Sequence, residues 1–141
     1  AETYMDNYKL SEKIHFHGWV PKNEIGSYYS RAHINIFPSE NEGWPKVLSE
    51  GMAYGVVPVS SAVGSIPQIL AETGAGISVP SFDIDAYVAA IESLINAPTL
   101  WKTYSNNAFD AANKFTYENY LQAVRDLFNE EWSIELPGDL S

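Results

Sequence analysis

The sequence predicts an α/β domain in which helices cover both faces of a parallel β-sheet. Strand-like and helix-like segments alternate along the chain, and the segments between successive strands are long enough for helical crossovers. Residues 56–60 form a short, nearly continuous apolar run, which is typical of a parallel strand buried on both faces. The 141 residues suffice for one such domain with a hydrophobic core.

The predicted strands are short segments that alternate apolar and polar residues or are apolar throughout. In the first of them, Ile14 and Phe16 alternate with histidines before Gly18 ends the segment. Pro38 ends the second strand, because proline has no N–H to donate to a sheet ladder. The four predicted strands are residues 14–18, 34–38, 56–60 and 76–80.

The predicted helices combine an apolar face with residues that favour helix ends. Pro45 suits the first position of its helix, and Asp83 and Thr116 suit N-terminal caps. The predicted helices are residues 21–31, 44–54, 66–72, 84–96, 98–115 and 116–132. Residues 2–10 resemble the end of an earlier helix, and residues 133–141 a loose tail.

Two of these helices have apolar faces that we expect to pack on the sheet. The face of the helix 44–54 consists of Val47, Leu48, Gly51, Met52 and Gly55. The face of the helix 84–96 consists of Tyr87, Val88, Ile91, Leu94 and Ile95.

The composition excludes several classes of protein. Eighteen acidic and 8 basic residues give a net charge of -10, which repels nucleic acid and anionic membrane surfaces. The absence of cysteine excludes a disulfide scaffold and a thiolate metal site. No apolar run approaches the roughly 20 residues that span a bilayer, and the first residues lack a signal-peptide pattern. We expect a cytoplasmic protein, which leaves open attachment of a longer parent to the inner face of a membrane.

Two carboxylates, Glu42 and Glu50, bracket a predicted strand-to-helix junction, the place where α/β domains hold small molecules. Along a helical path, with a rise of about 1.5 Å per residue, the two carboxylates are on the order of 10 Å apart. The helix start between them favours a phosphate, and Gly43 lets a ligand approach the backbone. The spacing alone also allows a surface ion pair between Lys46 and Glu50, or a Glu42 that merely complements the helix dipole.

The stretch from residue 37 to residue 55, FPSENEGWPKVLSEGMAYG, resembles the donor-site signature of retaining GT-B glycosyltransferases of the family-4 type. That signature has two Glu separated by seven residues, with Gly, an aromatic residue and Pro after the first Glu. Residues 56–59 and 64–69 resemble its continuation, and residues 16–20 resemble the strand and loop of the base pocket. The resemblance covers roughly residues 10 to 130. It implies a Rossmann-like domain that is part of the C-terminal half of a GT-B fold.

The resemblance also implies roles for individual residues. Glu42 would contact the donor sugar as a positioning group rather than a nucleophile, and Glu50 would bind the ribose hydroxyls. The backbone around Gly43, Trp44, Pro45, Lys46 and Val47 would hold sugar or diphosphate oxygens, and Gly18, Trp19 and Val20 would line the base pocket. Neither a metal nor a cofactor is expected, and we interpret His15, His17 and His33 as solvated or core residues.

Several features depart from that family. Gln68 stands where Glu is usual, and Ser65 where a second Gly is common. The Arg and Lys that neutralise the diphosphate, and the acceptor-binding N-terminal domain, are not recognisable. We therefore expect residues 1–132 to be an N-terminally truncated nucleotide-sugar-binding domain, inactive alone, which dimerises through exposed sheet edges or by exchanging segments.

The expected activity of the intact parent is hexosyl transfer with retention, in glycan, polysaccharide or glycolipid biosynthesis. The expected partners are a nucleotide sugar and an acceptor held by the missing domain, and no nucleic acid. Two alternatives stay open. One is a module that binds nucleotide sugars without catalysis, and the other is a nucleotide-sugar epimerase of similar fold.

Overall fold

A parallel three-stranded sheet forms the centre of the computed structural model, which describes residues 8, 10 and 12–136. Its strands are β1 (Ile34–Phe37), β2 (Val57–Ser61) and β3 (Ile77–Val79), with β2 in the middle. In the register, Ile36 lies opposite Val59, which in turn lies opposite Ile77. The predicted segment 2–10 and the tail beyond residue 136 lie almost wholly outside the described residues.

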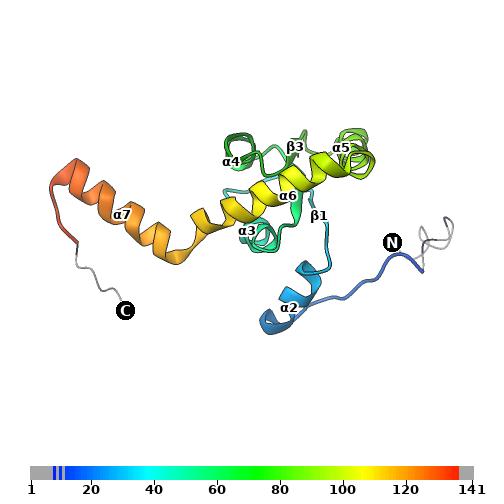
Figure 1. Cartoon of the computed structure of the whole chain (residues 1–141), viewed down its shortest axis with the longest axis horizontal. Helices are drawn as coiled ribbons and strands as arrows, with labels where there is room; N and C mark the ends of the chain where they lie inside the picture. Colours follow the sequence, from blue (N-terminus) through cyan, green and yellow to red (C-terminus); the bar gives the residue numbers. More distant parts are fainter. Residues whose placement is uncertain (1–7, 9, 11, 137–141) are drawn as a thin grey trace.

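Helices follow and separate the strands as the sequence predicts (Figure 1). The elements are α2 (Lys22–Tyr29), α3 (Lys46–Met52), α4 (Ile66–Thr73), α5 (Ile84–Asn96), α6 (Pro98–Ala112), the 3-10 turn η1 (Asn113–Phe115) and α7 (Tyr117–Trp132). Asp83 and Thr116 cap α5 and α7 as predicted, because each side chain accepts a backbone N–H three residues later.

The start of α3 differs from the prediction. Pro45 is the N-cap rather than the first helical residue, since its backbone is extended at φ -74° and ψ 129°. Its carbonyl already accepts the N–H of Leu48 at 3.0 Å, which is the usual role of an N-cap carbonyl.

The predicted strand at residues 14–18 is wrong: this segment lies outside the described sheet. The N–H of Ile14 is committed to a turn, because it donates to the carbonyl of Leu10 at 3.0 Å. Phe16 is 69% exposed, so the alternating pattern buries little. A strand needs a ladder partner as well as a pattern. Within the described chain, the outer edge of β1 is therefore unpaired.

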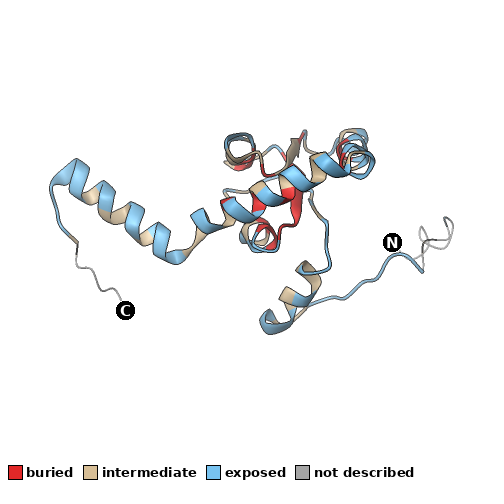
Figure 2. Ribbon diagram, in the orientation of Figure 1, coloured by how far each residue is buried: buried red, intermediate tan, exposed pale blue. Residues whose placement is uncertain are grey.

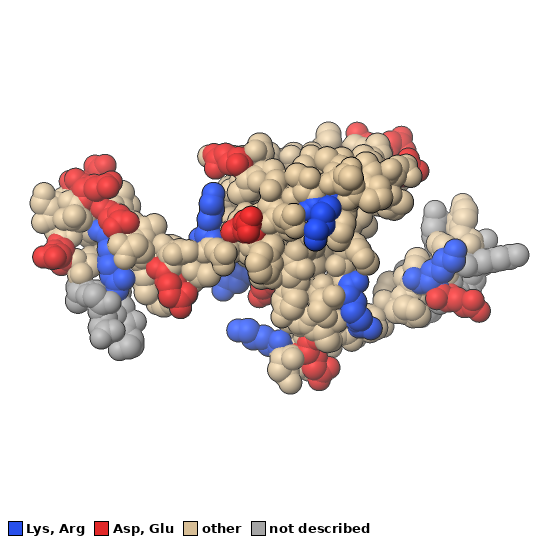
Figure 3. All heavy atoms as spheres, in the orientation of Figure 1, with Lys and Arg blue, Asp and Glu red and all other residues tan. Residues whose placement is uncertain are grey.

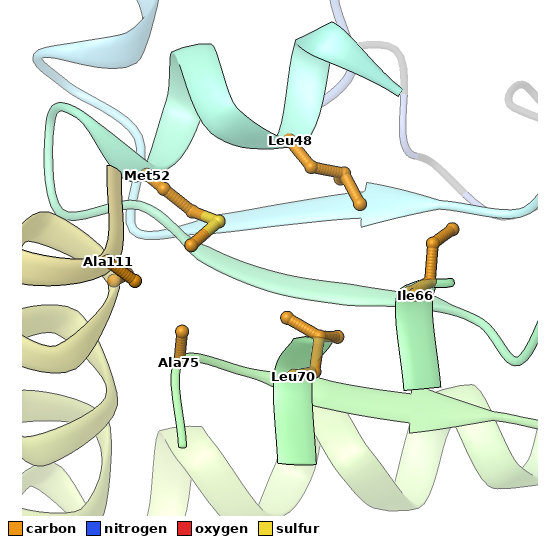
Figure 4. Close-up of a cluster of buried hydrophobic side chains, with 7 residues drawn as sticks. Leu48, Met52, Ile66, Leu70, Ala75 and Ala111 are labelled. Atoms are coloured by element: carbon orange, nitrogen blue, oxygen red, sulfur yellow. The ribbon is translucent and has the colours of Figure 1, made fainter. Parts of the chain in front are cut away.

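The sheet separates two hydrophobic clusters. On one face, Leu48 and Met52 of α3 pack against Ile66 and Leu70 of α4, and α6 adds Ala111 (Figure 4). The other cluster joins residues of β2 and β3 to α5 and the first half of α6. All five residues of β2 are buried, as expected for a central strand. This confirms the predicted parallel sheet with helices on both faces.

The buried face of α5 is narrower than predicted. Tyr87, Ala90 and Leu94 are buried, whereas Val88 and Ile95 are 47% and 64% exposed. The buried positions are three and four residues apart, so one thin stripe of the helix meets the sheet.

Helix α7 carries no buried residue and extends away from the rest of the molecule (Figures 1 and 2). Its sequence is amphipathic, yet Tyr117, Tyr120 and Trp132 are each more than half exposed. Acidic side chains are frequent along this helix (Figure 3). Within the described residues, α7 therefore adds little to the core.

Candidate functional site

Two loops interlock at the carboxyl ends of β1 and β2. Gly64, in the loop after β2, has φ +55°, and a Cβ there would lie 1.9 Å from the carbonyl oxygen of Glu42. Only glycine allows so close an approach. The next residue, Ser65, donates both its hydroxyl and its N–H to the carbonyl of Gly43, at 2.9 and 3.1 Å. The loop after β2 therefore fixes the backbone of the loop after β1, where the sequence predicts the site.

The carboxylate of Glu42 is held within its own loop. Ser39 donates its hydroxyl to Oε1 of Glu42 at 3.1 Å, and both side chains are half-buried. Gly43 is exposed, and a Cβ built on it would meet nothing within 4 Å. The structure thus places a positioned carboxylate beside an open stretch of backbone.

The residues after Gly43 turn their side chains in different directions. Trp44 stacks on Phe115, with ring centroids 4.7 Å apart and planes 19° apart, and its buried Nε1 has no partner within the described chain. Pro45 is buried, whereas Lys46 is exposed. Trp44 and Pro45 therefore support the loop from beneath, which leaves the backbone as the part that can meet a ligand.

Glu50 lies exposed on the second turn of α3, beside Tyr29 at the end of α2. Burial raises the pKa of Tyr29, and the nearby charge of Glu50 raises it further. The hydroxyl of Tyr29 lies 3.5 Å from the carbonyl oxygen of Val47, to which it donates. The ring of Tyr29 also lies against Gly51, where a Cβ would be 3.4 Å from it. Glu50 therefore lies close to a tyrosine of another helix.

The predicted base-pocket loop lies against α2 in the described structure. Gly18 has φ +62°, and Trp19 is 85% exposed. The ring of His17 packs edge-on against Tyr28 at 4.8 Å. Figure 1 shows this segment running from α2 away from the sheet. The described contacts do not join Gly18, Trp19 or Val20 to Glu42 or Glu50.

Ser39 and Tyr29 are the site residues that the sequence did not predict. Serine and tyrosine are common, and neither stands in a spacing that signals a carboxylate partner. Gln68, where the family usually has Glu, donates to Glu72 within α4 at 2.8 Å.

In the described part of the chain, no group of three or more His, Cys, Asp or Glu side chains could hold a metal ion. No helix there is long and apolar enough to cross a membrane.

Several curated proteins with similar sequences are glycosyltransferases. The chain is 26% identical over 121 residues to a D-inositol 3-phosphate glycosyltransferase of Streptomyces bingchenggensis, covering 86% of the chain and 27% of that protein. It is 28% identical over 117 residues to the enzyme of the same name from Corynebacterium aurimucosum, covering 83% and 28%. The chain thus spans about a quarter of the length of these relatives.

Solved structures share the fold. The sucrose-phosphate synthase of Thermosynechococcus elongatus matches 94% of the chain and 33% of its own length, with a TM-score of 0.78 and 26% identity. Anabaena HepE, solved in complex with UDP, matches 92% of the chain and 35% of its own length, with a TM-score of 0.79 and 16% identity. The α/β architecture is therefore that of GT-B glycosyltransferases.

A family model covers most of the chain. The model described as Glycosyl transferases group 1 matches residues 1–111, which include both interlocked loops and the two carboxylates. The chain belongs to the family Glycosyl transferases group 1.

Proposed function

We propose that this chain is the donor-binding part of a retaining, family-4 type glycosyltransferase that takes a hexose from a nucleotide-diphosphate donor. The observation that carries the proposal is the pair Glu42 and Glu50 at one strand-to-helix junction. Ser39 donates a hydrogen bond to the Glu42 carboxylate, and Glu50 lies close to Tyr29 of α2. Open backbone at Gly43 lies between them in the sequence.

In this proposal the two carboxylates bind opposite ends of the donor. Glu42 accepts hydrogen bonds from hydroxyl groups of the sugar, and Glu50 accepts them from the ribose, because carboxylate oxygens are strong acceptors for paired hydroxyls. The backbone from Gly43 to Val47 lies along the diphosphate. Family membership supports these roles, as does the exposure of Gly43, Lys46 and Glu50.

The proposed reaction breaks the bond between the anomeric carbon and the diphosphate oxygen. The acceptor oxygen forms the new bond to the anomeric carbon on the same face, and its proton passes to the departing nucleoside diphosphate. The contribution of this chain is to fix the donor sugar, and precise placement of reactants lowers the barrier. Glu42 acts as a positioning carboxylate in this scheme, and no metal or cofactor takes part. Products of this class include glycans, polysaccharides and glycolipids made in the cytoplasm.

Donor binding tests the role of Glu50. We expect Glu50→Ala to weaken binding of the preferred donor among UDP-, GDP- and ADP-glucose about ten-fold, because hydrogen bonds to a charged group are lost. The matched control is Glu92→Ala, since Glu92 is exposed on α5. Isothermal titration calorimetry on the natural full-length polypeptide measures both. Equal donor affinity in Glu50→Ala and wild type would refute the ribose role.

The same protein separates the alternatives through its products. Transfer consumes donor only when an acceptor is present, whereas an epimerase changes the donor sugar without one. A binding module leaves the donor intact in both cases. Following the anomeric proton by NMR, with and without a mixture of acceptors, distinguishes the three and reports retention directly.

A further inference from the structure

A chain of buried hydroxyl groups connects α5 to the loop that carries Glu42. Tyr87 of α5 is 8% exposed, and its hydroxyl lies 3.2 Å from the carbonyl of Phe37 and 2.9 Å from Oγ of Ser61. Ser61 is 1% exposed, and its Oγ accepts the N–H of Ser39 at 3.0 Å. These contacts lie at the carboxyl ends of β1 and β2, next to the candidate site.

The contacts fix the direction of each hydrogen bond. Tyr87 donates to the carbonyl of Phe37, since a carbonyl can only accept. Ser61 is then the donor to Tyr87, and the oxygen of Ser61 remains the acceptor for Ser39. Every hydroxyl is paired, and buried networks that are fully paired are rigid. Ser39 is thus held by its backbone while its side chain donates to Glu42.

The composition of β2 changes where this network begins. Val57 and Val59 are fully buried and apolar, whereas the last two residues of the strand are serines that are equally buried. Ser60 also donates to the carbonyl of Phe37, at 3.1 Å. An apolar pair would pack the core as well without needing partners, because buried hydroxyls cost free energy unless they are bonded. The hydroxyls lie at the end of the strand that meets the site.

We propose, on the basis of the proposed function, that Tyr87, Ser61 and Ser39 form a positioning network for Glu42. The network holds Ser39 so that its hydroxyl occupies Oε1 of Glu42, which leaves Oε2 as the oxygen that accepts a hydroxyl of the donor sugar. Gly64 and Ser65 hold the backbone of the same loop from its other side. The orientation of the sugar-binding carboxylate is therefore set in part by α5, a helix outside the set of residues proposed to bind the donor.

Comparison of a nucleotide sugar with its nucleoside diphosphate tests the network. We expect Ser39→Ala to weaken binding of the preferred nucleotide-glucose about ten-fold, while affinity for the matching nucleoside diphosphate stays unchanged because that ligand lacks the sugar. Tyr87→Phe should act in the same direction, and Ser39→Thr should retain wild-type affinity because it restores the hydroxyl. All variants are made in the natural full-length polypeptide.

Two matched variants control for general damage. Ser93→Ala removes a serine hydroxyl on the same helix as Tyr87. Tyr104→Phe alters a tyrosine that packs against the hydrophobic cluster to which Tyr87 belongs. Both should bind as the wild type does. Equal weakening of nucleotide sugar and nucleoside diphosphate in Ser39→Ala would show a purely structural role and overturn the proposal. Wild-type affinity in both Ser39→Ala and Tyr87→Phe would overturn it as well.

A double-mutant cycle with Glu42→Ala, which removes both carboxylate oxygens, shows whether Ser39 acts through Glu42. In the Glu42→Ala background, Ser39→Ala should cause no further loss of nucleotide-sugar affinity. A further ten-fold loss there would mean that Ser39 acts independently. If Glu42→Ala alone binds nucleotide sugar as the wild type does, the proposed function of Glu42 fails together with the network. If Glu42→Ala weakens binding while Ser39→Ala and Tyr87→Phe do not, the network fails and the function stands.

Discussion

At the scale of single residues, two glycines of the site have opposite physical requirements. Gly64 has a positive φ and lies against the carbonyl of Glu42, whereas Gly43 faces open space. The first glycine is therefore needed for folding of the loop. Gly43 meets no such requirement, and the lack of a side chain there leaves room for a ligand to approach the backbone.

Alanine substitutions separate these two requirements. We expect Gly64→Ala to lower the free energy of unfolding by about 2–4 kcal/mol, from left-handed strain and the forced displacement of the Glu42 carbonyl. Gly43→Ala should change it by less than about 0.5 kcal/mol, as surface substitutions usually do, yet weaken donor binding. Urea denaturation and calorimetry measure the two effects. Equal stability of both variants would contradict this assignment.

The residue scale is also where sequence reasoning is weakest. Glu42 and Glu50 are candidates because residues 37–55 resemble a donor-site signature, and their roles stay predictions. The neighbouring Ser39 and Tyr29 could not be predicted, since ordinary residue types become partners only when the chain folds. Tyr87 illustrates the distance involved: it bonds the carbonyl of Phe37, 50 residues earlier in the chain.

At the scale of elements, α2 and α3 meet through Tyr29, whose ring covers Gly51 and whose hydroxyl donates to the carbonyl of Val47 at 3.5 Å. Because the pKa of Tyr29 is raised in the folded state above its ordinary value of 10.0, folding favours the neutral phenol. The stabilisation is present below pH 10.0 and is lost as the pH rises through the folded pKa.

Alkaline unfolding tests this contact between helices. Above pH 10.0 we expect the free energy of unfolding of the wild type to fall more steeply with pH than that of Tyr29→Phe. Glu50→Gln should reduce the difference without abolishing it, since burial is the largest cause of the shift. Urea titrations at several alkaline pH values supply the slopes. Parallel curves for wild type and Tyr29→Phe would argue against the contact.

The sequence predicts helices and strands well where nearby residues determine where an element begins or ends. Helices α5 and α7 begin after Asp83 and Thr116, because capping depends on nearby residues. The strand predicted at residues 14–18 failed because a strand also requires a ladder partner, which an alternating pattern cannot supply. The exposure of Val88 and Ile95 shows the same limit, since the breadth of a buried face depends on what packs against it.

At the scale of the whole molecule, the outer edge of β1 has no strand partner among the described residues, and it lies beside Ile36, which is 52% exposed. Exposed edges favour pairing with another chain, whereas the net charge of -10 opposes it. The balance between these two effects depends on ionic strength.

Self-association should therefore rise with salt. We predict that this 141-residue polypeptide dimerises, by edge pairing or exchange of segments, more strongly at about 0.5 M than at about 0.02 M salt, because screening reduces the repulsion. Ile36→Lys should weaken the dimer by placing a charge on the edge strand. Light scattering over a concentration series measures both. A monomer at high salt and high concentration would rule the dimer out.

The contact between Gly64 and Glu42 has a consequence for how this sequence can change over time. The two residues belong to loops on adjacent strands, and the alignment of Phe37 with Ser60 brings them together. Inserting or deleting a residue in either loop would separate them, even with both carboxylates retained. We expect natural variants to keep the lengths of both loops together, so that loop length, rather than residue identity alone, marks which related sequences preserve this geometry.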